Sequence, residues 1–232
     1  MMSKWMALAA AVTLLSAAQA GQHVISGTVR DFDGHPVPGA DVALKSSSFD
    51  DLYTAKADAE GRYRITVEDG RYMALESITM PDYGKTRLEA WVWNVPVQAD
   101  MTIDVRYHRL EIYGVNVFKV QGAGPGLIAY FRPMSLTRAK SKDTKKDPDI
   151  APLPAEMDLA IDVDGVAAKI DTIERVQEYV GPGPVMYSYL VHFSPANAYT
   201  KGTHVVRIVG TDKANGDRGE GQYFYTAPEY RK

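Results

Sequence analysis

Several short motifs combine residue types that could perform metal or acid–base chemistry. His108 and Glu111 have the spacing of a His-x-x-Glu zinc-ligand pair. A strand, however, points residues three apart to opposite faces, and only His192 and His204 follow as further histidine ligands. We therefore interpret the motif as a polar joint between two domains.

Two pairs of aspartates lie beside turn sequences, where carboxylates can bind calcium. Asp162 and Asp164 share a face at a strand end, an arrangement that could also supply two carboxylates for hydrolysis. Asp212 and Asp217 fall in a second turn. Turn residues are the commoner interpretation of all four, so the sequence predicts no closed metal site and no cofactor.

The remaining motifs lack the context that their chemistry needs. Gly84-Lys85-Thr86 resembles the end of a phosphate-binding loop, but Thr79 stands where that loop needs its first glycine. The segment Gly122-Ala-Gly-Pro-Gly126 opens no helix. Ser188 lies within an expected strand and Ser194 precedes a proline, so neither forms a nucleophile elbow. We expect no enzyme active site.

The strand expected at 86–95 carries tryptophans on a face that its domain core does not need. One face is apolar and sufficient for a core, with Leu88, Ala90 and Val92. The other face comprises Glu89, Trp91, Trp93 and Val95. Because large aromatic side chains on an outer face require a partner, Trp91 and Trp93 could pack against a second domain, cover a loop of their own domain, or stack on a sugar. Tyr223 and Tyr225, which flank Phe224, are further candidates for a ligand or interface surface.

Composition and charge exclude several classes of protein. The 232 residues include 26 Lys+Arg against 29 Asp+Glu, a net charge of −3, and no cysteine. A general nucleic-acid binder needs a basic footprint, which this balance does not supply. Without cysteine the chain has no disulfide, thiolate metal site, thiol nucleophile or lipid attached to a cysteine.

The N-terminus has the pattern of an export signal. Lys4 precedes an apolar run from Met6 to Leu15, and Ala18-Gln-Ala20 is a small-x-small cleavage site. We expect cleavage near Ala20 and a mature chain from Gly21. No later segment is apolar enough to span a membrane. The sequence therefore predicts a periplasmic or secreted protein with neither a transmembrane anchor nor a lipid anchor.

The rest of the chain alternates apolar and polar residues as strands do. In 101–107 every second residue is apolar, as one buried face requires. Turn residues such as Asp33-Gly34 and Asp58-Ala-Glu-Gly61 separate the runs. We expect strands at 24–30, 40–44, 62–67, 72–75, 86–95, 101–107, 127–136, 157–163, 166–173, 185–193, 204–209 and 222–226.

Strands at this even spacing predict an all-β protein with two antiparallel β-sandwich domains, not alternating β/α units. The alternation changes phase at His108-Arg109, so we place the domains at 21–107 and 108–232. Residues 138–156 mix basic residues with aspartates and prolines, which predicts a long charged loop.

Two motifs in the first domain resemble a known family. A strand ending Gly27-Thr-Val29 leads into Asp31-Phe-Asp-Gly-His-Pro-Val-Pro-Gly-Ala-Asp-Val42, and the second motif comprises Asp58, Gly61, Tyr63, Gly70 and Tyr72. Over residues 22–107 they resemble the carboxypeptidase regulatory-like domain family. The resemblance implies a transthyretin-like (prealbumin-like) sandwich that usually acts as a non-catalytic module beside peptidases or in envelope proteins. Some members share a carbohydrate-binding-like fold, so the resemblance implies glycan contact at the family level only.

The second domain resembles bacterial immunoglobulin-like modules more loosely. The resemblance rests on the strand Tyr189–Phe193, the run Gly202-Thr-His-Val-Val-Arg-Ile-Val209 and the turn Asp212-Lys-Ala-Asn-Gly216. It implies an immunoglobulin-like sandwich for 108–232. A pilin-type domain with an internal Lys–Asn bond is a rival for the first domain, but the expected lysine is missing from His23–Val29.

These observations favour an exported, non-enzymatic binding or accessory module of the cell envelope, with an envelope protein or a glycan as partner. One alternative is a carbohydrate-binding protein with an exposed aromatic platform of Trp91, Trp93, Tyr223 and Tyr225. A second is an accessory subunit of an extracytoplasmic hydrolase. Burial of the two tryptophans between the domains would favour the first interpretation, and their exposure the carbohydrate-binding one.

Overall fold

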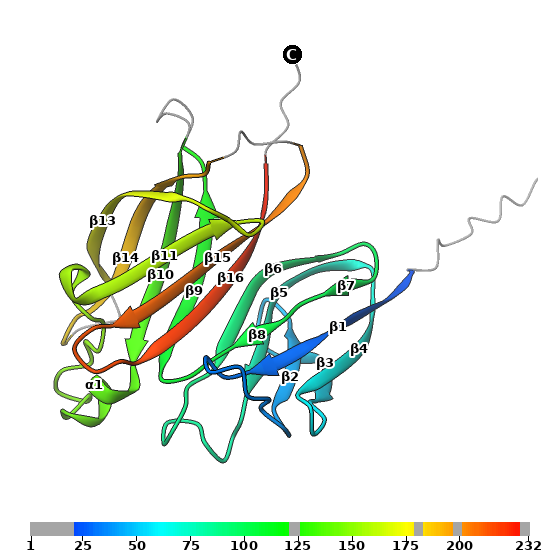
Figure 1. Ribbon diagram of the computed structural model, residues 1–232, viewed down its shortest axis with the longest axis horizontal. Helices are drawn as coiled ribbons and strands as arrows, with labels where there is room; N and C mark the ends of the chain where they lie inside the picture. Colours follow the sequence, from blue (N-terminus) through cyan, green and yellow to red (C-terminus); the bar gives the residue numbers. More distant parts are fainter. Residues whose placement is uncertain (1–20, 121–125, 179–182, 197–200, 228–232) are drawn as a thin grey trace, which may run out of the picture.

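We describe a computed structural model of residues 21–120, 126–178, 183–196 and 201–227 (Figure 1). These residues form β-strands almost throughout, with one short α-helix and one short 3-10 helix among them. The all-β prediction is confirmed. The expected signal peptide at 1–20 lies outside the described residues. Among those described, no helix is long and apolar enough to cross a membrane.

The strands divide evenly between the two halves of the chain, and both short helices lie in the second half. The first half contains β1 (Gln22–Arg30), β2 (Asp41–Lys45), β3 (Asp51–Lys56), β4 (Arg62–Glu68), β5 (Gly70–Ile78), β6 (Ala90–Val97), β7 (Met101–Thr102) and β8 (Val105–Arg106). The second half contains β9 (Leu110–Phe118), β10 (Leu127–Ser135), α1 (Leu136–Lys140), the 3-10 helix η1 (Pro154–Glu156), β11 (Met157–Val163), β12 (Val166–Ala167), β13 (Lys169–Glu178), β14 (Met186–Ser194), β15 (Thr203–Asp212) and β16 (Arg218–Thr226).

The strands form two sandwiches that share one continuous sheet (Figure 1). This sheet has eight strands in the order β12-β11-β15-β16-β6-β5-β2-β3. The two halves join where β16 pairs in parallel with β6, through Gly221 with Trp91 and Tyr223 with Trp93. A sheet of β4-β1-β7, with β8 also on β1, completes the first sandwich, and β13-β14-β10-β9 completes the second. Since pairing crosses the expected boundary, the division at 107/108 stays a prediction.

Most strand pairs are antiparallel, as expected, but three are parallel. They are β1 with β7, β1 with β8, and β16 with β6. The sequence also gave no signal for β3 or for most of β9. Strand β3 is short and mostly exposed, so it lacks the buried alternation on which the prediction depended.

Turn chemistry in the first sandwich explains its two sequence motifs. Asp31 Oδ1 accepts hydrogen bonds from the backbone N–H groups of Asp33 and His35, both at 2.9 Å. Asp58 Oδ1 accepts from the N–H of Arg62 in the same way at 2.8 Å. Gly61 has φ 76°, and a Cβ there would lie 2.4 Å from the carbonyl oxygen of Val29. Only glycine fits both the dihedral angle and the close approach.

Each sandwich has its own core, and strands at the join contribute to both. The first core includes Ile25, Leu44, Leu75, Val92, Val95, Tyr107 and Phe224. The second includes Trp91, Trp93, Leu110, Phe131, Tyr189, Phe193, Ile208 and Tyr225. Thus β6 and β16 send alternate side chains into different cores, as a strand with two buried faces must.

The alternation of β6 changes at Asn94. We expected Val95 on the face of Trp91 and Trp93, and that expectation was wrong, because Val95 lies in the first core. Asn94 has φ 60°, a left-handed conformation that asparagine tolerates better than most residues. This residue moves the next side chain to the opposite face.

Strand β9 crosses closely over β16 because β16 has glycines at the contact. A Cβ on Gly219 would lie 1.9 Å from the carbonyl oxygen of Leu110, and one on Gly221 would lie 2.8 Å from a side-chain carbon of Ile112. Both contacts are shorter than a real Cβ allows. The glycines therefore allow the sheet that contains β9 to pack close to the shared sheet.

The charged segment 138–156 is anchored to the second sandwich at several points. It begins in α1, whose N-cap Ser135 accepts from the N–H of Arg138, and it ends in η1. Arg175 forms an ion pair with Asp149, and the Tyr189 hydroxyl donates to the carbonyl of Pro152 at 2.7 Å.

Candidate functional site

The two tryptophans of β6 lie between the sandwiches, not on an open surface. Trp91 is 4% exposed and Trp93 is 8% exposed. Their rings stack at 5.1 Å with an interplanar angle of 21°. The ring of Tyr113 on β9 meets both edge to face, at 5.6 and 5.3 Å. Phe49, at the tip of the β2–β3 hairpin, meets them from the other sandwich at 6.2 and 6.5 Å.

Buried carboxyl groups lie beside these rings. The Trp91 ring N–H donates to Glu111 Oε1 at 2.9 Å. Burial, and then the neighbouring Glu89, raise the pKa of Glu111 well above its usual value. Burial and the charge of Glu76 raise the pKa of Glu89. Burial, with both glutamates nearby, raises the pKa of Tyr83 to about 12.

We call Phe49, Glu89, Trp91, Trp93, Glu111 and Tyr113 the joint cluster. Glu111 is almost completely buried within it. A protonated carboxyl group in that position can hydrogen-bond without the cost of burying a charge. The cluster is therefore suited to holding two sandwiches together.

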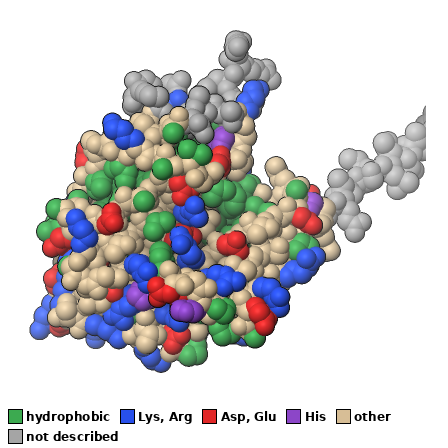
Figure 2. Space-filling model, in the orientation of Figure 1, with side chains coloured by type: hydrophobic (Ala, Val, Ile, Leu, Met, Phe, Trp, Pro, Cys, Tyr) green, Lys and Arg blue, Asp and Glu red, His purple; other side chains and the backbone are tan. Residues whose placement is uncertain are grey.

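A groove of about 730 Å³ opens beside the joint cluster, within the usual size range of ligand sites. Its floor includes Met73, Trp93 and Asn94, and Gly114–Asn116 of β9 form one wall. Residues 45–47 and Leu52, at the β2–β3 hairpin, also line it. Hydrophobic side chains are visible in the hollow between the sandwiches, while charges of both signs are interspersed elsewhere on that face (Figure 2).

A second groove of about 410 Å³, lined by Tyr113 among others, shares Gly114 with the first. Glu178 lies in it, accepting a hydrogen bond from the Tyr130 hydroxyl at 2.5 Å and pairing with Arg132. Burial alone would raise the pKa of Glu178, but hydrogen bonds from Arg132 and its neighbours outweigh burial and lower it. The two grooves meet at the backbone of β9.

The two candidate tyrosines of β16 have different environments. Tyr225 is 5% exposed and lies in the second core. Tyr223 is half-buried and lines the larger groove. Three of the four aromatic candidates are therefore buried. The assignment of Trp91, Trp93, Tyr223 and Tyr225 to a ligand or interface surface stays a prediction.

The first pair of calcium candidates is engaged by neighbouring side chains. Asp162 pairs with Arg207 at 2.8 Å and also accepts from the N–H of Gly165. Asp164 contacts His204 at 2.7 Å. Both carboxylates thus stabilise the β11–β12 turn and its neighbour β15.

The second pair, Asp212 and Asp217, belongs to a buried network with arginines. Asp212 binds Arg138 through both oxygens, at 2.6 and 3.0 Å. Asp217 accepts from Arg109 at 2.9 Å, and from Ser135 and the N–H of Thr137 at 2.8 Å. We call Arg109, Ser135, Thr137, Arg138, Asp212, Asn215 and Asp217 the arginine network. Its geometry ties α1 to the β15–β16 turn.

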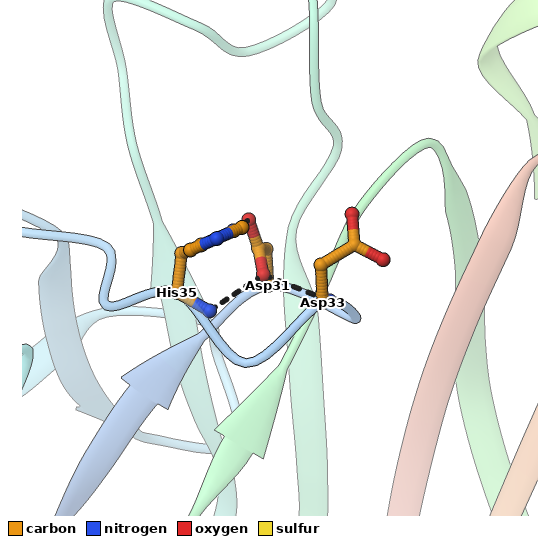
Figure 3. A group of neighbouring side chains, drawn as sticks. All are labelled: Asp31, Asp33 and His35. Carbon is orange, nitrogen blue, oxygen red and sulfur yellow. Dashed lines mark hydrogen bonds and ion pairs between the residues drawn. The ribbon is translucent and has the colours of Figure 1, made fainter.

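A different group of possible metal ligands lies on the β1–β2 turn: Asp31, Asp33 and His35. Asp31 and His35 point toward one another, while the carboxylate of Asp33 points away (Figure 3). That carboxylate pairs with Arg218 at 2.9 Å, and Asp31 accepts the turn N–H groups described above. Turn formation thus accounts for the side chains of Asp31 and His35, and the ion pair with Arg218 for that of Asp33.

The His-x-x-Glu motif is divided between two environments. Glu111 belongs to the joint cluster, while burial, and then the charge of Arg218, lower the pKa of His108. The backbone carbonyl of His108 accepts from the N–H of Leu88 at 2.8 Å.

Sequence reasoning missed Phe49, the Glu89–Glu111 pair and the bend at Gly114. Phe49 has φ 66°, an unusual value for a bulky residue, which no sequence pattern predicted. The one available signal was Glu89, a charged residue on the same face as two tryptophans.

Comparisons with known proteins agree with the first sequence motif. Residues 24–106 match the model of the carboxypeptidase regulatory-like domain family, so the resemblance expected for the first domain is confirmed. No curated protein matches the sequence. The immunoglobulin-like character of the second domain stays a prediction.

Several solved structures are similar in outline. A variant of the major pilin subunit BcpA of Bacillus cereus has 10% identity and a TM-score of 0.31, covering 88% of this chain and 68% of that one. A DUF3823 family protein from Parabacteroides merdae has 11% identity and a TM-score of 0.29, covering 90% and 100%. The major pilin SpaD from Corynebacterium diphtheriae has 9% identity and a TM-score of 0.27, covering 88% and 64%. At these TM-scores the similarity carries no argument about function.

Proposed function

We propose that this chain is an exported, non-enzymatic binding or accessory module of the cell envelope, which presents one groove on two rigidly joined sandwiches. The observation that carries the proposal is the join itself. One sheet continues through β16 and β6, and Trp91 and Trp93 are buried against the second sandwich. A groove whose walls come from both sandwiches keeps its shape only if they do not move independently.

Burial of the tryptophans supports this proposal over a carbohydrate-binding platform. A platform needs aromatic faces open to solvent, whereas Trp91, Trp93 and Tyr225 are each less than a tenth exposed. The family match of residues 24–106 also supports a module that works beside a partner. Either an envelope protein or a glycan is compatible with the polar rim of the groove, which includes the exposed Arg71 and Asn116.

The proposal is tested by photo-crosslinking in the cells that export the protein. A photoreactive amino acid at Asn116, which is exposed in the groove, should give a specific adduct in the envelope fraction. The matched control is the same amino acid at Thr66, an exposed position on β4. N-terminal sequencing should find Gly21 first. Cytoplasmic protein that still begins at Met1, or equal adducts from both positions, would contradict the proposal.

A further inference from the structure

The groove occupies the place where one more strand would lie. The four-stranded sheet ends at β9, whereas the shared sheet beneath it continues past β6 through β5, β2 and β3. Beyond β9, the half-buried Met73 and the largely buried Trp93 therefore line the floor of the groove. The hairpin residues Lys45–Ser47 stand opposite β9 and close the far side.

The edge of β9 lacks the usual protection of a sheet edge. Natural edge strands carry charged residues or proline, or are very short, because an open edge pairs with other chains. From Tyr113 to Phe118 the sequence of β9 contains no charged residue and no proline. Its protective features are the inward-pointing Glu111 near its start and the bulge at Gly114, and regular pairing with β10 resumes at Asn116.

The other edges within the described residues are protected, and the part of β11 that β12 leaves open contains the exposed Asp158. Strand β13 has a charged residue at every second or third position, and β4 carries Arg62, Arg64 and Glu68. Strand β3 begins with Asp51 and ends with Lys56. Strands β7, β8 and β12 have two residues each. The edge beside the groove is thus the exception.

We propose that this groove takes an extended peptide segment of a partner protein, which pairs with β9 as an added strand. The inference rests on the proposed function and names the class of its ligand. Backbone N–H and C=O groups along the open edge of β9 would supply the affinity. Alternate side chains of the segment would face Trp93 and Met73, so aliphatic residues fit there, with hydroxyl or charged residues between them.

The geometry at both walls favours a single strand over a second folded copy of this chain. Gly114 has φ 66°, and a Cβ there would meet no atom within 4 Å, so the bulge leaves room at one end of the edge. The hairpin opposite β9 would obstruct the sheet that a second copy brings with its own edge. A free peptide segment has no such sheet.

The test uses the full mature chain and a synthetic peptide, acetyl-Lys-Thr-Val-Thr-Val-Thr-Lys-amide. Bound peptide should slow hydrogen exchange of alternate amides in 113–118 by at least about tenfold. Amides of the β4 and β13 edges should be unaffected. A second peptide of the same sequence, N-methylated at alternate residues, cannot pair along that edge and should not bind.

Matched variants locate the binding. Asn116→Lys adds an edge lysine at an exposed position and should weaken peptide binding about tenfold, whereas Thr66→Lys on β4 should leave it unchanged. The proposal is overturned if no β9 amide is protected at millimolar peptide, if the N-methylated peptide binds equally well, or if β9 becomes protected without peptide as the chain self-associates. The Asn116 crosslink decides separately whether the groove binds a partner at all, so the proposed function can survive failure of strand addition.

Discussion

Two groups of buried carboxyl side chains support the second sandwich, and they differ in the charged groups that surround them. In the arginine network, Asp212 and Asp217 are matched by Arg138 and Arg109. Burial alone would raise the pKa of Asp212, but hydrogen bonds from Arg138 and its neighbours lower it. In the joint cluster, burial and the proximity of Glu89 raise the pKa of Glu111. Charge pairing thus holds one site, while the other contains a carboxyl group whose pKa is raised by burial among apolar side chains.

The largest expected effect comes from removing the apolar part of the joint cluster. Burying two indole rings removes on the order of 300 Å² from water, or roughly 7 kcal/mol before ordering costs. Replacing Trp91 and Trp93 with serine should uncouple the sandwiches while each stays folded. Calorimetry should then show two unfolding transitions, and solution scattering a larger radius.

The matched control replaces the same two tryptophans with phenylalanine. Phenylalanine retains most of the apolar contact, so a single transition should persist. If the serine variant also keeps one unchanged transition, the joint cluster does not couple the sandwiches, and the shared β6–β16 pairing must suffice alone.

The next effect concerns the arginine network. Asp217→Ala leaves the guanidinium of Arg109 and the N–H of Thr137 without their acceptor. Breaking one side of a buried ion pair should lower the free energy of unfolding by about 3–5 kcal/mol, as measured by urea denaturation. Asp158→Ala, at an exposed position of β11, is the control and should change it little. If both variants lower the free energy of unfolding by similar amounts, the arginine network does not contribute the expected stabilisation.

The two groups should respond to pH in opposite directions. Because the pKa of Glu111 is raised, the folded protein keeps this proton to a higher pH than the unfolded chain does. Its stabilisation is complete below the ordinary glutamate pKa of about 4.3 and is lost as pH rises through the raised value. Asp212, with a lowered pKa, stabilises above the ordinary aspartate value of about 3.9 and loses that contribution as pH falls.

Glu111→Gln and Asp212→Asn separate the two responses. The glutamine side chain still accepts a hydrogen bond from Trp91 but does not ionise. The free energy of unfolding should therefore decline less above about pH 4.5, and the difference should be about 1.4 kcal/mol for each unit by which the pKa of Glu111 is raised. Asp212→Asn should flatten only the acid side. Denaturant unfolding at half-unit pH steps measures both. If the stability of Glu111→Gln still falls above about pH 4.5 as steeply as that of the wild type, the raised pKa does not belong to Glu111.

Local patterns in the sequence predicted the first sandwich well because its turns depend on neighbouring residues. For example, Asp58 and Gly61 stabilise one turn, the first through a side-chain hydrogen bond to the backbone and the second through its left-handed dihedral angle. The groove depends instead on residues far apart in sequence. Pairing of β5 with β6 brings Met73 beside Trp93, and the parallel β16–β6 pairing joins the sandwich that carries Gly114 to them. The alternation of β6 predicted a second buried face but not the left-handed Asn94 that ends it. Two tryptophans on the face that the first core does not need indicated a possible contact with the second domain. Nothing in the sequence identified Phe49 or Glu111 as their neighbours.

The smallest expected effect separates the two tryptophans of the joint cluster from each other. The Trp91 ring N–H donates to Glu111, so Trp91→Phe leaves a buried acceptor unpaired. This should lower the free energy of unfolding by about 1–3 kcal/mol, in addition to the loss from the smaller ring. Within the described residues, the buried Trp93 ring N–H has no acceptor. Trp93→Phe removes an unsatisfied donor, which offsets the loss of ring contact, so the free energy of unfolding should fall by less than about 1 kcal/mol. Urea denaturation of both variants beside the wild type measures the difference. Equal losses would mean that a bound water or a groove occupant satisfies the Trp93 donor, and the loss at Trp93 should then depend on whether the peptide is present.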